Sequence, residues 1–131
     1  MFVQITALLA RVLLSAIFLI SGTLKLIMPT AAIASIAKLH MPLPAQLAWL
    51  VAVLIELGGG LCVLLGYRTR PASIVLAGFC IATGLLVHYH PSSPDQMTHF
   101  MKDLAIAGGF LQLAATGPGR FVLARGRNAT W

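Results

Sequence analysis

Charged residues are scarce in this sequence, and acids are the scarcest among them. Only 9% of the 131 residues are charged, with three acids against nine Lys and Arg residues. A soluble globular domain has about 25% charged residues, so this shortage excludes an ordinary soluble protein. The net charge of +6 does not indicate a nucleic-acid partner, because the basic residues are scattered and form no patch with interleaved aromatics.

Cysteine is also rare, and Cys62 and Cys80 lie in separate apolar stretches. They show neither a CxxC pattern nor any metal-ligand spacing. At 1.5 Å per residue they fall at different depths, about 6 Å and about 13 Å from the same end of their helices. We therefore expect no disulfide, and buried apolar packing is the simpler interpretation.

Apolar residues make up 59% of the chain and gather in four long stretches. A membrane-spanning helix needs roughly 17–25 predominantly apolar residues. The first two stretches meet this length outright, and the third and fourth are borderline. The sequence therefore predicts a single domain with an all-α fold, an integral-membrane four-helix bundle. Its helices cover residues 3–27, 45–66, 71–88 and 98–116, and a tail follows at 117–131.

The connection after the first predicted helix contains a short apolar-periodic segment between Pro29 and Pro42. This segment is too short to span a bilayer, so we expect a short interfacial helix in the first outer loop. The next connection is only a few residues long. It predicts a tight hairpin in which Gly66 ends one helix and Pro71 opens the next.

The distribution of basic residues predicts the orientation of the bundle. With four spans, both termini lie on one face, and that face has five arginines against three lysines on the other. Positive residues concentrate in cytoplasmic loops, so we expect both termini to be cytoplasmic. The arginines are Arg68, Arg70, Arg120, Arg125 and Arg127, and the lysines are Lys25, Lys38 and Lys102.

Small residues recur within the apolar stretches and predict a tightly packed bundle. Lipid supplies no hydrophobic drive for helix association, so membrane helices pack through small faces. The glycines assigned to helix packing are Gly22, Gly58, Gly59, Gly60, Gly108 and Gly109.

Two ionisable residues fall deep in the predicted spans. Arg11 and Glu56 lie about 12 Å and about 15 Å from the same surface at 1.5 Å per residue, so we expect them to meet. A charge near mid-bilayer costs about 2.5–3.5 kcal/mol on insertion scales and commonly has a role. Two interpretations stay open: a structural clamp between the first two helices, or a polar pocket that orients or protonates a ligand such as a quinone.

A second group of ionisable residues falls near the outer ends of the helices. Lys25, His88, Lys102 and Asp103 are expected there at similar depth. Snorkelling to the head groups explains the lysines. His88 could instead exchange protons with a quinol, because imidazole titrates near physiological pH.

Metal and haem sites are not expected. The spacing of His88, His90 and His99 matches no standard metal site. Axial haem ligands should come from facing helices inside the bilayer, and no histidine lies deep in a predicted span.

Several motifs occur in an order and spacing that point to a known family. They are "ARVLLSAIFLISGTLKL" from Ala10, "ELGGGLCVLLGYRTR" from Glu56, the histidine at 88, "FMKDLAIAGGFLQL" from Phe100, and "GPG" at 117–119. With these motifs the chain resembles the DoxX family of small four-helix inner-membrane proteins, and within it the YqjF-like branch. The resemblance runs from Arg11 to Phe121.

The resemblance implies a multi-pass protein of the bacterial inner membrane, embedded in the lipid bilayer. Some similar proteins look like membrane subunits of thiosulfate:quinone oxidoreductase or of terminal oxidase assemblies. We therefore expect a redox-linked subunit or accessory protein that interacts with a quinone, ubiquinone or menaquinone, and with other subunits of a redox complex. A homo-oligomer also fits. The candidate pocket residues are Arg11, Lys25, Glu56, His88 and Lys102.

No catalytic residue is identified, and any enzymatic role would be that of a quinone-linked oxidoreductase subunit. The alternative is a non-catalytic membrane scaffold or assembly factor for a redox or stress-response complex.

Overall fold

The computed structural model describes residues 1–123, which are helical apart from short connections. The predicted all-α fold is confirmed, and a π-helix follows both α3 and α5 without a break. In chain order the elements are α1 (Phe2–Ile27), α2 (Pro29–Ala37), α3 (Ala45–Leu54), η1 (Ile55–Gly59), α4 (Gly60–Leu65), α5 (Thr69–Thr83), η2 (Gly84–His88) and α6 (Pro94–Thr116), where η marks a π-helix.

Three helical segments in the described residues are long and apolar enough to cross a membrane: Phe2–Ile27, Ala45–Leu65 and Thr69–His88. α6 has 23 residues, and a helix of that length reaches about 35 Å, enough for a hydrocarbon layer of about 30 Å. It is less apolar because charged residues lie in its first half. The four long helices predicted from the sequence are therefore present, and the fourth is the most polar.

The helix ends lie close to their predicted positions, with one clear difference. α6 begins at Pro94, four residues before the predicted start at 98, because proline is well suited to the first turn of a helix. The short helix predicted in the first outer loop is α2, which also has a proline, Pro29, in its first turn. Gly66 ends α4 in the left-handed conformation at φ 75°, as a C-terminal glycine commonly does.

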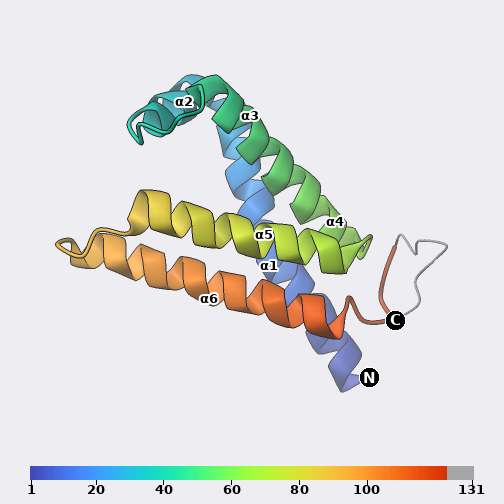
Figure 1. The fold of residues 1–131 in the computed structure, drawn as a ribbon. Helices are drawn as coiled ribbons and strands as arrows, with labels where there is room; N and C mark the ends of the chain where they lie inside the picture. Colours follow the sequence, from blue (N-terminus) through green and yellow to red (C-terminus); the bar gives the residue numbers. More distant parts are fainter. Residues whose placement is uncertain (124–131) are drawn as a thin grey trace.

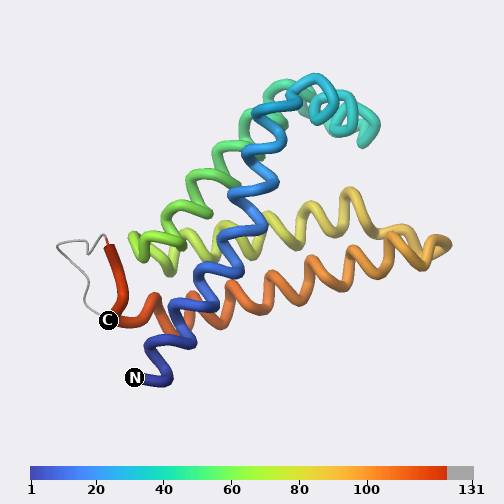
Figure 2. Tube along the Cα trace, turned by 180° about the vertical axis from the view of Figure 1, so that it is seen from behind, coloured from blue at the N-terminus to red at the C-terminus, as the bar shows by residue number. Residues whose placement is uncertain are grey.

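The helices form two antiparallel hairpins (Figures 1 and 2). The first hairpin pairs α1 with the continuous helix of α3, η1 and α4, and α2 lies at its closed end. The second pairs α5 and η2 with α6. We call the end with α2 and the η2–α6 connection the outer end, and the end with the N-terminus and the α4–α5 turn the terminal end.

The two hairpins are joined toward the terminal end and diverge toward the outer end (Figure 1). α1 packs on α6, and both η1 and α4 pack on α5. Among the described elements, η2 packs only on α5 and α6. Side chains at the outer end of one hairpin are therefore separated from those of the other.

The core lies where the hairpins cross. Phe18 of α1 packs edge-on against Phe110 of α6, with ring centroids 5.4 Å apart. Leu76 and Val63 are fully buried beside them, and Cys80 is also buried in this cluster. Cys62 and Cys80 are both free thiols.

Four of the six glycines assigned to packing lie at close helix contacts. A Cβ atom at each of them would come within 2.8–3.2 Å of a leucine on a neighbouring helix. Gly58 and Gly108 differ, because no heavy atom lies within 4 Å of a Cβ built there. Consecutive residues of a helix point about 100° apart, so a run of glycines cannot face one neighbour throughout. The four contact glycines are Gly22, Gly59, Gly60 and Gly109.

Candidate functional site

The buried acid Glu56 pairs with Lys25. The Nζ atom of Lys25 lies 2.9 Å from both carboxylate oxygens and donates to Ser21 Oγ at 2.7 Å. Ser21 in turn donates to Glu56 Oε1 at 3.1 Å. The side chain of Glu56 is 5% exposed and that of Lys25 is 26% exposed. We call Ser21, Lys25 and Glu56 together the lysine–glutamate site.

Local sequence explains how this site forms. Ser21 and Lys25 are four residues apart on α1 and therefore share one face of the helix. Gly22 beside them allows η1 to approach, because a Cβ there would lie only 3.2 Å from Glu56 Cβ. Trp49 donates its indole N–H to the carbonyl of Lys25 at 3.1 Å, which fixes the end of α1 against α3. Glu56 itself belongs to a π-helix, and such segments frequently occur at functional sites.

Arg11 is buried as well, with 1% of its surface exposed, but its partners are backbone carbonyls. Its Nε donates to Val63 O at 2.9 Å and its Nη2 donates to Leu64 O. Its Nη1 donates to Pro118 O at 3.1 Å and to Phe121 O. The last carbonyls of a helix lack intrahelical partners, and a cation is favourable there. Arg11 therefore ties α4 and the segment after α6 to α1.

The predicted contact between Arg11 and Glu56 is wrong, although both residues are buried in the bundle. Side chains of a helix lean toward its N-terminus. Because α1 and α3–α4 are antiparallel, Arg11 leans toward the terminal end while Glu56 leans toward the outer end. Lys25 leans back toward Ser21 and meets the acid there. The prediction used only the depths of Arg11 and Glu56 along their helices, which do not show the direction in which each side chain leans.

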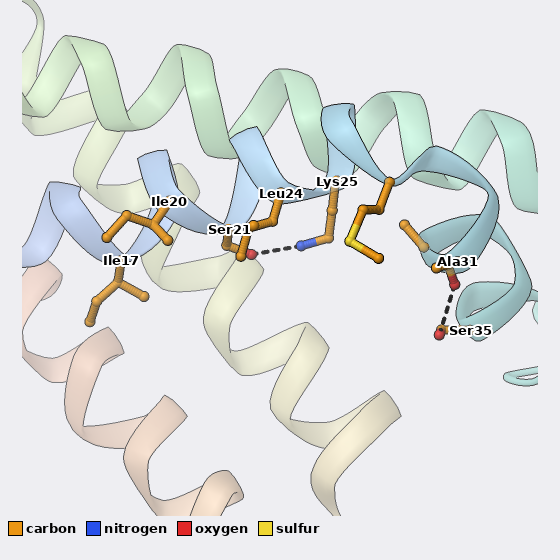
Figure 3. Close-up of a pocket in the computed structure, with 9 residues that line it drawn as sticks. Ile17, Ile20, Ser21, Leu24, Lys25, Ala31 and Ser35 are labelled. Carbon is orange, nitrogen blue, oxygen red and sulfur yellow. Dashed lines mark hydrogen bonds between the residues drawn. The ribbon is translucent and has the colours of Figure 1, made fainter.

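An open groove lies beside the lysine–glutamate site, between α1 and α2 (Figure 3). Its volume is about 600 Å³, and most of its lining is apolar. The hydrogen bond between Lys25 and Ser21 lies along its wall. The lining residues are Ile17, Ile20, Ser21, Leu24, Lys25, Met28, Ala31, Ala32 and Ser35.

A second polar cluster lies on the other hairpin, where His88 ends η2. Its Nδ1 lies 3.0 Å from Gln96 Oε1, and its Nε2 lies 3.9 Å from Asp103 Oδ2. The rings of His88 and His99 are 5.3 Å apart. Asp103 Oδ2 is buried and has no hydrogen-bond partner among the described residues. We call His88, Gln96, His99 and Asp103 the histidine–aspartate site.

The prediction of a single outer cluster is therefore wrong, because its residues are divided between two sites. Lys25 belongs to the lysine–glutamate site, and His88 and Asp103 belong to the histidine–aspartate site. The divergence of the hairpins separates them. Lys102 joins neither site and is exposed, since neighbouring residues of a helix point about 100° apart and Asp103 takes the inward direction.

No metal-binding arrangement is found in residues 1–123, where no group of three or more His, Cys, Asp or Glu side chains is placed to hold an ion. His90 is exposed, outside the histidine–aspartate site.

The terminal end brings the N-terminal helix and the segment after α6 together. The backbone N–H of Arg120 donates to Gln4 Oε1 at 2.7 Å. The N–H of Leu123 donates to the carbonyl of Leu65 at 3.0 Å. Arg125 and Arg127, which the sequence assigned to this end, lie outside the described residues with the rest of 124–131.

Long helices with exposed apolar faces and a charge pair buried between them define a small multi-pass integral membrane protein. Residues 6–89 match the DoxX family. The chain belongs to the DoxX family, as its motifs predicted. The matched segment contains Arg11, Lys25, Glu56 and His88 and ends before Lys102.

Two relatives come from Escherichia coli (strain K12). "Inner membrane protein YqjF" is 42% identical over 81 residues, which cover 62% of this chain and 62% of YqjF. "Inner membrane protein YphA" is 32% identical over 123 residues, which cover 90% of this chain and 87% of YphA. No solved structure matches the chain.

Proposed function

We propose that this protein is a quinone-interacting subunit or accessory protein of a membrane oxidoreductase system. One observation carries the proposal: the ion pair between the partly exposed Lys25 and the buried Glu56 borders an open, mostly apolar groove on α1. An ionisable pair inside a membrane is costly and is by default a candidate functional site. A ligand with a polar ring and a long apolar tail needs this combination of surfaces.

The lining of the groove fits ubiquinone or menaquinone. Ligand pockets commonly measure about 300–1,000 Å³ and are largely apolar with a few placed polar groups. Ile17, Ile20 and Leu24 follow one another along a single face of α1, since residues three and four apart are neighbours on a helix. This strip suits an isoprenoid tail. Lys25 Nζ, at the outer end of the strip, suits a ring carbonyl.

Each residue of the site has a role in this proposal. A bound quinone would supply the capacity to accept electrons and protons. Lys25 Nζ would exchange its hydrogen bond to Ser21 Oγ for one to an acceptor oxygen in the groove. Glu56 balances the charge of the ammonium within the apolar layer, and Ser21 holds the two in register. Arg11 is not one of the pocket residues, because it ties backbone segments together at the terminal end.

The arrangement of charges supports an orientation with both termini in the cytoplasm. By sequence, the face with both termini has five arginines and the outer face has three lysines, Lys25, Lys38 and Lys102. Positive residues favour the cytoplasmic side. Both relatives are inner membrane proteins by name, and we place this chain in the same membrane. The groove then opens toward the periplasmic leaflet. Other redox subunits or a second copy are the expected protein partners.

Quinone binding by matched variants tests the proposal. We expect ubiquinone and menaquinone analogues to bind the protein saturably in nanodiscs. Lys25→Met should weaken binding about tenfold, because a hydrogen bond to a charged group contributes about 1.5–3 kcal/mol and 1.4 kcal/mol is a factor of ten. Lys102→Met is the control, because Lys102 is exposed and does not line the groove. Absence of saturable binding, or equal loss in both variants, would contradict the proposal.

A second candidate, a non-catalytic scaffold, is favoured by a different observation. Lys25 Nζ already contacts Ser21 Oγ and both Glu56 oxygens, and a polar group with satisfied hydrogen bonds needs no ligand. An apolar replacement of a buried ion pair can be neutral or stabilising. The double variant Lys25→Met/Glu56→Leu should therefore still retrieve a stoichiometric partner in a pull-down if the protein is a scaffold. Loss of saturable quinone binding in this variant, with partner binding retained, would favour the quinone role.

A further inference from the structure

The two hairpins place an acid against a glycine in the same way. In the first, a Cβ at Gly22 would lie 3.2 Å from Glu56 Cβ, and in the second, a Cβ at Gly84 would lie 3.2 Å from Asp103 Cβ. Each glycine is on the first helix of its hairpin, close to the outer end, and each acid is on the second. Each hairpin also contains one π-helix at this level.

A basic side chain completes the arrangement in both hairpins. Lys25 follows Gly22 by three residues, and His88 follows Gly84 by four, so each base lies about one helical turn further toward the outer end. Both bases have a carboxylate on the facing helix. The histidine–aspartate site therefore occupies in the second hairpin the position that the lysine–glutamate site occupies in the first.

The two sites differ in one respect, since the second is not closed. Lys25 Nζ and Glu56 lie 2.9 Å apart, whereas His88 Nε2 and Asp103 Oδ2 lie 3.9 Å apart. That distance is too long for a hydrogen bond. Asp103 Oδ2 is nevertheless buried and without a hydrogen-bond partner in the described chain, and such an atom destabilises the fold until it finds a donor.

The hydrogen bond to Gln96 determines which nitrogen of His88 can supply that donor. With the amide oxygen 3.0 Å from Nδ1, Nδ1 carries the hydrogen and donates it. A neutral imidazole has only one N–H, so Nε2 then faces Asp103 without a proton. Only the protonated ring presents an N–H to the carboxylate.

We propose that His88 and Asp103 form a proton-binding site at the outer end of the second hairpin. One proton from the outer aqueous phase binds His88 Nε2 and is donated in a hydrogen bond to Asp103 Oδ2, which changes the charge of the pair from −1 to 0. A charge-assisted bond is about 2.8 Å long, so closure shortens the distance between Nε2 and Oδ2 by about 1 Å. Gly84 and η2 lie at this contact.

The surroundings of His88 contain few other charges. α6 contributes Asp103 and His99. The connection after η2 contributes Tyr89, which packs on Phe100, and the exposed His90. Among the described elements no other helix packs on η2. No residue of the histidine–aspartate site lines the groove, so the inference does not depend on quinone binding.

Nitrogen-15 NMR of the histidine side chains in nanodiscs tests this inference on the full-length protein. The signals that are lost in His88→Gln identify His88. When the ring is protonated, the His88 Nε2–H signal should show the downfield shift of a charge-assisted hydrogen bond, and Asp103→Asn should remove that shift, because the accepting carboxylate is lost. Asp95→Asn is the control, since Asp95 is an exposed acid in the first turn of the same helix.

A second measurement, on the carboxylate of Asp103, shows whether the NMR result arises from loss of folding. In the unmodified protein, acidification should shift the infrared carboxylate band of Asp103, identified by its loss in Asp103→Asn, without forming a carboxylic-acid C=O band. In His88→Gln the proton should bind Asp103 itself and that C=O band should form, while Lys25 and Glu56 remain in place. A His88 Nε2–H signal that is unchanged in Asp103→Asn, or that changes equally in Asp95→Asn, would overturn the inference. So would a carboxylic-acid band of Asp103 in the unmodified protein over the pH range in which His88 gains its proton. Quinone binding is not used as a readout, so the outcome is independent of the proposed function.

Discussion

Arg11 and Lys25 are the two basic residues of α1, and each stabilises a different contact. Arg11 donates four hydrogen bonds to backbone carbonyls of α4 and of the segment after α6. Lys25 donates to Ser21 and to both oxygens of Glu56. The first is a fixed tie between backbone groups, and the second is partly exposed to a groove. Mutation of Arg11 should therefore change mainly stability, and mutation of Lys25 should change mainly ligand binding.

Removal of the Arg11 guanidinium should destabilise the bundle. We expect Arg11→Met to lower the free energy of unfolding by about 3 kcal/mol, because bonds to a charged group contribute about 1.5–3 kcal/mol each and are not additive. Thermal unfolding in detergent measures the change. Arg120→Met is the matched control, since this exposed residue contributes its backbone N–H, and not its side chain, to the contact with Gln4. Equal stability of the two variants would show that Arg11 is not the tie.

The sequence contained the charges of both sites but not their pairing. Arg11 and Glu56 were expected to meet because they lie at similar depth, and the lean of helical side chains toward the N-terminus separates them. The signal that could have found Lys25–Glu56 is the Ser21, Gly22, Lys25 pattern, which puts two donors and a close approach on one turn of α1.

At the scale of elements, Gly22 and η1 determine how closely the first hairpin packs. A Cβ at Gly22 would lie 2.8 Å from Leu57 and 3.2 Å from Glu56. Leu57 is a flexible side chain that can move, but the Cβ of Glu56 is fixed by the backbone of η1. The lysine–glutamate site therefore depends on the absence of a side chain at position 22.

A bulky side chain at Gly22 should open the site. We expect Gly22→Leu to cost about 1–3 kcal/mol, as overpacking commonly does, and to weaken quinone binding together with stability. Gly58→Leu is its control, because a Cβ at Gly58 meets nothing within 4 Å, and its effect should stay within about 0.5 kcal/mol. Thermal unfolding in detergent distinguishes the two. A tolerated Gly22→Leu would contradict the packing described for η1.

Most helices could be predicted because their length and apolarity are plain in the sequence. The two π-helices could not, since a π-turn depends on how neighbouring helices fit and has no sequence signal of its own. α6 was expected to begin at 98 because the stretch from His88 to His99 is polar and rich in turn residues, but Pro94 begins the helix and Asp95 and Gln96 lie in its first turn.

At the scale of the whole molecule, the fold consists of two hairpins built on one plan. Each has a glycine and a base on its first helix and an acid on its second. The plan was not visible as a sequence repeat, because Lys25 and Glu56 are replaced by His88 and Asp103 and the spacing from glycine to base changes by one residue. One pair is closed beside a groove, and the other is open at the end of η2.

The division of the outer end follows from this arrangement. The hairpins are joined near the terminal end and diverge outward (Figure 2). Lys25 and His88 therefore serve separate sites, where the sequence suggested one. The proposed ligand site belongs to the first hairpin alone, with its tail-binding strip on α1 and its outer wall on α2.

Titration of a ubiquinone analogue against two variants of α2, each with one alanine replaced by phenylalanine, tests the central claim most directly. Ala31 and Ala34 are both exposed on this helix, but only Ala31 lines the groove. Phenylalanine at either position leaves every charge in place. The account predicts that Ala31→Phe abolishes saturable binding in nanodiscs while Ala34→Phe binds like the unmodified protein. Equal affinity of the two variants would contradict a quinone site in the α1–α2 groove.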